Sequence, residues 1–157
     1  GVEAEKIQVL VHPQSIVHSA VQFEDGSVKA QLGMPDMRLP IQYAFSYPDR
    51  LPLNGQRLDL FAQPLEFFEP NLRKFRCLQL AFDAINRGGN MPCILNAANE
   101  VVNEAFRADR IGFLDMPRII EETMLCVPFD AAPSLDTYLQ TDAEARIKAA
   151  QLVANTK

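Results

Sequence analysis

The sequence lacks the features that would place the protein in a membrane or on a nucleic acid. It has no apolar stretch near the roughly 18 to 20 residues that span a bilayer, and no signal-peptide pattern at its start. It also has no run of basic residues, and its formal net charge is -5. A nucleic acid or an anionic membrane would require a clustered positive field. We therefore expect a soluble cytoplasmic protein with neither partner.

Cysteine is scarce as well. Cys77, Cys93 and Cys126 are widely spaced, form no C-x-x-C pair and have no neighbouring histidine. This spacing excludes a compact zinc site and is typical of a reducing compartment. We expect all three to be buried free thiols.

Short motifs for nucleotide binding and hydrolysis are missing too. The sequence has no G-x-G-x-x-G, Walker A, G-x-S-x-G or H-E-x-x-H motif, and no acidic residues at calcium-loop spacing. The 157 residues, of which 48% are hydrophobic, are nevertheless enough to bury a core in one domain or two small ones. No self-contained active site is recognisable from such motifs.

The stretch from His12 to Arg38 holds both histidines and the clearest turn of the chain. Before it, Ile7–Val11 is apolar and β-branched, which predicts a strand that Pro13 ends. This stretch is therefore the first place to look for a functional site.

Asp25-Gly26 predicts a two-residue type I′ hairpin turn. If Glu24 pairs with Ser27, apolar side chains gather on one face of the hairpin. The pairs on that face are Phe23 with Val28, Val21 with Ala30, and Ser19 with Leu32. The same register places His18 opposite Gly33, beside the loop formed by residues 33–37.

A helix is predicted after this loop, with Asp36 able to cap it and Pro48 ending it. Pro40 falls in the first turn, where a missing N–H costs nothing. Residues 47–70 then contain four prolines and several aromatic residues. This composition predicts an extended connector rather than a helix.

Four helices are predicted beyond the connector. The first ends at Gly88-Gly89, the third begins near Asp115, and the fourth opens with the capping box Thr141-x-x-Glu144. The segment before it, Ser134–Leu139, is predicted to be a linker with at most one helical turn. The apolar stripes are Phe75, Leu78, Phe82 and Ile85; Ile94, Ala98, Val101, Val102 and Ala105; Met116, Ile119, Ile120, Thr123 and Met124; and Ile147, Ala150 and Ala154. The expected fold class is α+β: a hairpin with a helix, a Pro-rich connector and a small helical bundle.

Several side chains are candidates for chemistry. His18, on a strand beside a loop, is placed to line a pocket or to make a structural hydrogen bond. His12 and His18 would bind a metal only if a carboxylate such as Asp36 joined them. Met37 and Pro35 form an adaptable apolar surface suited to packing on a flat ring, or they fill a core. The polar stripe of Asn96, Asn99, Glu100 and Asn103 is typical of a solvated helix face.

A set of motifs resembles the 1-deoxy-D-xylulose 5-phosphate reductoisomerase family, in the order and spacing of that family's C-terminal portion. The motifs are His12-Pro13-Gln14-Ser15, His18-Ser19, Asp25-Gly26-Ser27, Ala30-Gln31-Leu32-Gly33, Pro35-Asp36-Met37-Arg38 and Leu95-Asn96-Ala97-Ala98-Asn99-Glu100. Met34 departs from the family, since some relatives have a polar residue there.

The resemblance implies part of an oxidoreductase that uses NADPH and Mg²⁺ or Mn²⁺. That enzyme converts 1-deoxy-D-xylulose 5-phosphate to 2-C-methyl-D-erythritol 4-phosphate in non-mevalonate isoprenoid biosynthesis. It also implies that Ser15 and His18 lie beside the substrate and metal pocket, and that Pro35 and Met37 pack near the nicotinamide. No residue here is assigned as a metal ligand, and neither NADPH nor a metal is expected to bind this chain alone.

The resemblance further implies three parts: residues 1–50 from the catalytic and dimerisation domain, a linker at residues 51–72, and a helical domain at residues 73–157. It implies a homodimer that forms through the sheet, and a separate N-terminal NADPH-binding domain. Two alternatives stay open. One is an independent oligomerisation or binding module without catalysis. The other is a small stand-alone enzyme using His18 and Asp36.

Overall fold

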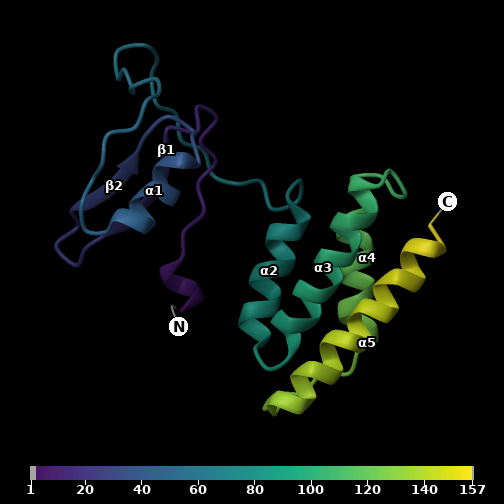
Figure 1. Cartoon of the computed structure of the whole chain (residues 1–157). Helices are drawn as coiled ribbons and strands as arrows, with labels where there is room; N and C mark the ends of the chain where they lie inside the picture. Colours follow the sequence, from purple (N-terminus) through teal and green to yellow (C-terminus); the bar gives the residue numbers. More distant parts are fainter. Residues whose placement is uncertain (1–2, 157) are drawn as a thin grey trace. The chain divides into compact units, whose positions relative to one another are not determined.

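The computed structural model describes residues 3–156, which form two compact units (Figure 1). Residues 9–70 contain the strands β1 (Val17–Gln22) and β2 (Val28–Leu32) and the helix α1 (Arg38–Ser46). The second unit contains a short 3-10 helix, η1 (Ala4–Lys6), and four α-helices from residue 71 onward. The predicted α+β fold class is confirmed. The predicted division with a linker at residues 51–72 stays a prediction, although contacts group residues 51–70 with the hairpin and α1.

The predicted hairpin register is wrong by one residue. Only Gly26 in the turn has a positive φ, +83°, whereas a type I′ turn would require one at Asp25 as well. The Asp25 carboxylate instead accepts hydrogen bonds from the backbone N–H and the hydroxyl of Ser27 (2.9 and 2.6 Å). The loop therefore has three residues, closed by the Phe23 N–H donating to the Ser27 carbonyl (2.9 Å).

This longer loop changes every pair across the sheet. The observed pairs are Gln22 with Val28, Val21 with Lys29, Ala20 with Ala30, Ser19 with Gln31 and Val17 with Leu32. The predicted apolar face does not form, because each valine near the turn now faces a polar side chain. The register also shifts between Val17 and Ser19, so that His18 lies at a bulge and is not opposite Gly33.

The strand predicted at Ile7–Val11 is wrong as well. Only Val11 forms a β-bridge, and its partner is Phe68 at the far end of the connector. The helix predicted after Asp36 is confirmed as α1, with Pro40 in its first turn. Asp36 lies just before the helix, where its carboxylate accepts the Arg38 backbone N–H (3.0 Å).

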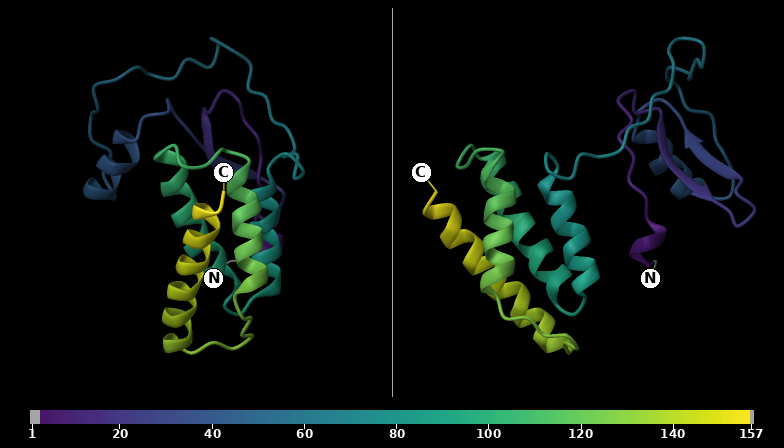
Figure 2. Two further views of the ribbon diagram at one scale, coloured as in Figure 1. Left: turned by 90° about the vertical axis from the view of Figure 1, so that its right-hand side faces the viewer. Right: turned by 180° about the vertical axis from the view of Figure 1, so that it is seen from behind.

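The second unit is built on α2 (Arg76–Arg87), α3 (Met91–Arg107), α4 (Asp115–Cys126) and α5 (Leu135–Ala154). The helix α3 is central and packs against the other three (Figure 2). The stripe predicted for α4 is confirmed, since all five of its residues are buried. The stripe predicted for α3 is largely confirmed, with Val101 only partly buried. None of the helices in the described part of the chain combines the length and apolar character needed to cross a membrane.

The predicted start of the last helix is wrong. The helix α5 begins at Leu135, and Ser134 caps it by accepting the Thr137 backbone N–H (3.1 Å). Thr141 is therefore inside the helix, not at its cap. The core-facing residues are Thr141, Ala145, Ala149 and Val153, and the predicted Ile147, Ala150 and Ala154 are exposed.

The predicted core stripe of α2 is wrong in part. The buried residues of this helix are Leu80 and Ala84, whereas the predicted Leu78 and Phe82 are half-buried and Phe75 and Ile85 are exposed. The helix has apolar residues on two faces, and the face with Leu80 and the smaller Ala84 is the one buried in the core of the helical unit. Its end at Gly88, with φ of +68°, is as predicted.

The three cysteines are free, as expected, but they are not buried. Cys77 and Cys126 are exposed and Cys93 is half-buried. Desolvation by the surrounding protein atoms nevertheless raises the pKa of the Cys77 thiol.

A solvated polar face on α3 is confirmed, since Asn96, Asn99, Glu100 and Asn103 are all exposed. Glu100 accepts a hydrogen bond from Asn96 and forms an ion pair with Arg146 of α5 (2.6 Å). The Arg146 guanidinium holds the pKa of Glu100 below its usual range.

One buried amide connects the loops of the helical unit. Asn90, which is 1% exposed, donates to the Pro128 carbonyl (3.0 Å) and the Thr141 hydroxyl (3.1 Å). Its side-chain oxygen accepts the Asp130 backbone N–H (2.9 Å). A Cβ on the neighbouring Gly89 would lie 2.1 Å from the Asp130 carbonyl oxygen, so only glycine permits this close approach.

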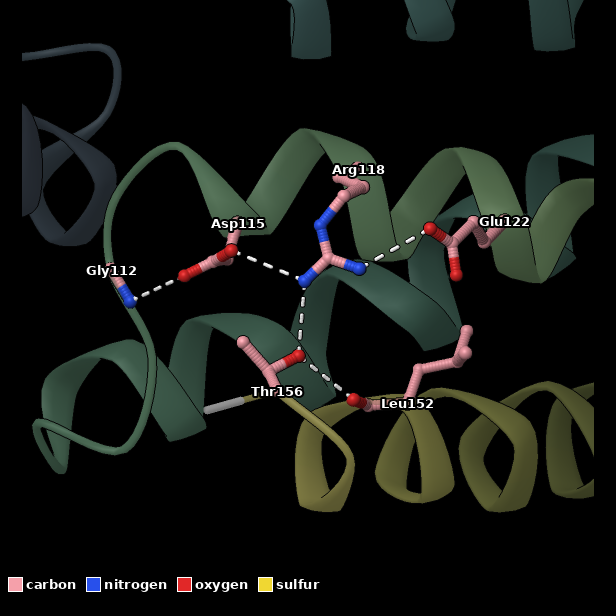
Figure 3. Close-up of polar contacts among 6 residues, drawn as sticks. All are labelled: Gly112, Asp115, Arg118, Glu122, Leu152 and Thr156. Atoms are coloured by element: carbon pink, nitrogen blue, oxygen red, sulfur yellow. Dashed lines mark hydrogen bonds and ion pairs between the residues drawn. The ribbon is translucent and has the colours of Figure 1, made fainter.

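A polar cluster joins α4 to the end of α5 (Figure 3). The Arg118 guanidinium donates to Asp115 (3.1 Å), Glu122 (3.2 Å) and the Thr156 hydroxyl (3.0 Å). Asp115 also accepts the Gly112 backbone N–H (2.9 Å). That bond, with the ion pair to Arg118, lowers the pKa of the Asp115 carboxyl.

We predict that Asn90→Ala lowers the free energy of unfolding by about 3 kcal/mol. The substitution removes the partner of the buried Thr141 hydroxyl and of the part-buried Pro128 carbonyl and Asp130 N–H. Urea unfolding followed by helical circular dichroism measures this loss. Asn99→Ala on the exposed face of α3 is the matched control and should change the value by less than about 0.5 kcal/mol. Equal losses in the two variants would contradict a special role for Asn90.

We predict that Asp115→Asn lowers Tm by a few degrees at neutral pH. The folded-state pKa of Asp115 is lowered, so its ionised form stabilises the fold at pH values above the pKa that Asp115 has in the unfolded chain. This contribution is lost as the pH falls through the folded-state pKa. The difference from the unsubstituted chain should therefore shrink below pH 3.8. Asp109→Asn removes the same charge while keeping a residue that tolerates the left-handed backbone there, and it should shift Tm less. A pH-independent difference would refute the assignment.

Candidate functional site

All four site residues predicted from the sequence line one cavity in the unit formed by residues 9–70. The cavity has a volume of about 590 Å³, and Ser15, His18, Pro35 and Met37 are among its lining residues. The other walls come from Gln31 and the loop after β2, from the first half of α1, and from Arg50. The structure thus brings together residues more than 20 positions apart in the sequence.

Ser15 reaches this cavity from a tight turn. Its φ is +52°, in the left-handed region that non-glycine residues rarely adopt, and its N–H donates to the His12 carbonyl (3.1 Å). The next residue, Ile16, is 3% exposed and is the one buried hydrophobic side chain among residues 9–70. The turn therefore places Ser15 at the cavity while Ile16 anchors the chain.

His18 is presented by the bulge in β1. Its side chain is exposed. This arrangement favours the pocket interpretation of His18 over a structural hydrogen bond.

The apolar part of the cavity wall is formed by the loop after β2. Met37 is 71% exposed and Pro35 is also exposed, so neither fills a core. An exposed methionine beside a proline gives an adaptable apolar surface.

Asp36 contributes a carboxylate that is already engaged. The Arg38 guanidinium donates to both of its oxygens (2.6 and 3.0 Å). This side-chain hydrogen bonding holds the pKa of Asp36 below its usual range, so that the group is a weak base at neutral pH. The stand-alone enzyme with His18 and Asp36 as its acid–base pair is therefore not favoured.

Arg50 and Tyr43 are two of the lining residues that the sequence interpretation missed. The Arg50 guanidinium lies 4.1 Å from the centre of the Tyr43 ring and stacks on it. No carboxylate among the described residues lies within ion-pair distance of Arg50. The only sequence signal was the position of Arg50 just after the Pro48 turn, which gives no hint that the chain folds back on α1.

The two histidines do not converge. His12 lines neither cavity, and its ring stacks on Phe67 of the connector with 4.6 Å between ring centres. In residues 3–156 no group of three His, Cys, Asp or Glu side chains is placed to hold a metal ion. The combination of both histidines with Asp36 therefore does not form.

A second cavity, of about 630 Å³, lies between α1 and residues 50–58 of the connector. It shares Gly33, Met34, Asp36, Leu39, Tyr43 and Arg50 with the first. The shared residues show that one loop, one helix and one arginine border both spaces.

Taken together, the first cavity offers an apolar wall, the cation of Arg50, an exposed imidazole and a hydroxyl. Such a set suits a ligand with a flat or apolar part and an anionic or hydroxylated part. It includes no nucleophile with an adjacent base.

Comparisons with known proteins show the family of the chain. Residues 32–148 match the family described as the DXP reductoisomerase C-terminal domain. The chain is 61% identical over 155 residues to 1-deoxy-D-xylulose 5-phosphate reductoisomerase of Bacteroides thetaiotaomicron, and 51% identical over 151 residues to that of Porphyromonas gingivalis. These matches cover 98% and 96% of this chain but 40% and 39% of the relatives.

Solved structures give the same result. The reductoisomerase of Zymomonas mobilis in complex with NADPH is 42% identical, with a TM-score of 0.83 over 97% of this chain and 40% of its own. A DOX-P reductoisomerase in complex with NADPH, fosmidomycin and magnesium is 36% identical, with a TM-score of 0.83 over 98% of this chain. The chain thus spans about 40% of the length of its relatives. Because the family match extends over most of its residues, the chain belongs to the DXP reductoisomerase family through that family's C-terminal domain.

Proposed function

We propose that this chain is the C-terminal part of an NADPH-dependent reductoisomerase that converts 1-deoxy-D-xylulose 5-phosphate to 2-C-methyl-D-erythritol 4-phosphate in non-mevalonate isoprenoid biosynthesis. The main support is that one cavity is lined by all four residues that the family resemblance singles out. We propose in addition that the 157-residue chain alone is not catalytic, and that the working enzyme is cytoplasmic.

The residues present fit only one end of the cofactor. Exposed Pro35 and Met37 give the apolar surface on which a nicotinamide ring would pack. NADPH, when bound, supplies the hydride for the reduction step. Within this chain, Pro35 and Met37 orient the ring and exclude water from one side of it.

The described residues do not fit a metal ion, as no cluster of ligating side chains is present in them. We therefore assign no Mg²⁺ or Mn²⁺ ligand to this chain. His18 and Ser15 act in this proposal as polar side chains that hydrogen-bond the substrate or a neighbouring group. Arg50, unpaired and stacked on Tyr43, provides a positive charge at the cavity wall.

The alternative is an independent oligomerisation or binding module. The hairpin favours it, because β1 and β2 form a two-stranded sheet in the described part of the chain and Val21 and Val28 are both exposed. A sheet of this kind has unpaired edges on which another chain can add a strand. The same feature supports our proposal of a homodimer within the complete enzyme.

A turnover assay distinguishes the proposed part of a reductoisomerase from the independent binding module. We predict that the 157-residue chain, incubated with NADPH, Mn²⁺ and 1-deoxy-D-xylulose 5-phosphate, oxidises no NADPH above background. A longer protein of the family's full length with this chain at its C-terminal end should oxidise NADPH under the same conditions. Absorbance of NADPH measures both.

Turnover by the short chain would overturn the proposed dependence on the rest of the enzyme. Failure of the long protein, together with a stable dimer of the short chain in sizing chromatography, would favour the binding module.

We predict that Met37→Ala in the long protein lowers kcat/KM about tenfold, equivalent to about 1.4 kcal/mol, because the nicotinamide loses one wall of its site. Steady-state kinetics with varied NADPH measures the effect. Phe61→Ala is the matched control, since Phe61 is fully exposed on the connector and lines neither cavity. Unchanged kinetics for Met37→Ala would remove Met37 from the site.

A further inference from the structure

We propose that Glu66 is a positioning residue, which holds residues 12–14 so that the turn after them presents Ser15 to the cavity. Its effect on catalysis rests on the function proposed above, whereas its effect on the Ser15 backbone does not. Glu66 lies at the end of the connector, more than 50 positions from Ser15, and lines neither cavity. It would act on the site only through the residues that it contacts.

The carboxylate, the backbone N–H and the backbone carbonyl of Glu66 all form hydrogen bonds, and their partners are Gln14 and His12. Its carboxylate accepts a hydrogen bond from the Gln14 amide (2.8 Å), and its backbone N–H donates to the Gln14 side-chain oxygen (3.2 Å). Its carbonyl accepts a hydrogen bond from Nδ1 of His12 (2.7 Å). We refer to these contacts of Glu66 with His12 and Gln14 as the clasp.

The neighbouring residues extend the clasp in both directions. Val11 and Phe68 exchange two backbone hydrogen bonds of 2.9 Å each, and the His12 ring stacks on Phe67. Because a carbonyl can only accept, Nδ1 of His12 carries the proton in this contact. The other ring nitrogen, Nε2, is enclosed and has no partner among residues 3–156. His12 is thus fixed in one orientation by the connector.

The clasp ends directly at the strained turn. Gln14 precedes Ser15, and the Ser15 N–H donates to the carbonyl of His12, which is the other residue held by Glu66. A non-glycine residue at φ of +52° stays there only when its surroundings determine the conformation. On one side Ile16 is buried, and on the other the clasp fixes His12 and Gln14. Without the clasp, the turn would relax and Ser15 would leave the cavity wall.

An exchange of the two side chains tests the clasp. Gln14→Glu keeps the size of the side chain but places its carboxylate against that of Glu66. Adding Glu66→Gln restores the pair in reverse, because the new amide can donate to the new carboxylate and the residue 66 backbone N–H still has an acceptor. Glu69→Gln, on an exposed neighbouring carboxylate of the connector, is the matched second change and should restore nothing.

The first measurement is made on the 157-residue chain. We expect Gln14→Glu to shift the Ser15 backbone and Cβ resonances in NMR spectra and to speed amide exchange of Ser15. The Gln14→Glu/Glu66→Gln variant should return both to the original values, and Gln14→Glu/Glu69→Gln should not. Unchanged Ser15 resonances in Gln14→Glu, or equal recovery with either second change, would overturn the proposal.

The second measurement is made on the long protein. We expect Gln14→Glu to lower kcat about tenfold with KM for NADPH nearly unchanged, and the exchanged pair to recover it. A parallel loss of Tm and activity without this split between kcat and KM would show a structural role only, and would overturn the positioning role. If the unsubstituted long protein has no turnover, the proposed function fails, and the Ser15 resonances alone decide whether the clasp exists.

Discussion

The helical unit depends on one buried amide that is fully satisfied. Asn90 connects the loop before α3 to the loop before α5 and to the hydroxyl of Thr141 inside α5. A buried polar group is costly unless each of its atoms has a partner, so the three contacts permit only one arrangement of these loops. The close approach at Gly89 follows from the same arrangement. The burial of apolar side chains on α3 and α4 supplies the stability, and Asn90 determines where the connecting segments lie.

The unit that holds the candidate site is organised differently. It has a single buried hydrophobic residue, Ile16, in the described part of residues 9–70, and many of its large apolar side chains are exposed. Turns, a backbone bridge and side-chain hydrogen bonds hold it together instead. Exposed apolar side chains in such numbers are typical of a surface that another domain or chain covers.

The parts of the fold that could be predicted are those where one local pattern is decisive. The helix α4 has one apolar stripe, and all five residues were identified. The helix α2 has two, and the sequence does not say which one is buried. The start of α5 was misplaced because Thr141 and Glu144 match a capping pattern, while the hydroxyl of Thr141 bonds Asn90 from another part of the chain. Such a contact leaves no trace in the neighbouring residues.

The candidate site was likewise predictable only in part. The resemblance singled out Ser15, His18, Pro35 and Met37, and the structure places them around one cavity. The predicted hairpin register was wrong, because the contacts of Asp25 with Ser27 favour a three-residue loop over the two-residue loop that Asp-Gly suggests. The position of Arg50 and the clasp could not be predicted from the sequence, because both depend on the connector folding back on residues that are distant in the sequence.

The left-handed backbone at Ser15 also restricts which amino acids can replace it. Glycine adopts this conformation freely and asparagine tolerates it, whereas β-branched residues such as valine or threonine are strongly disfavoured. Serine accepts a backbone cost of about 1 kcal/mol that glycine would avoid. Glycine at position 15 would therefore keep the backbone of the turn and remove only the hydroxyl, whereas valine would disturb the backbone as well.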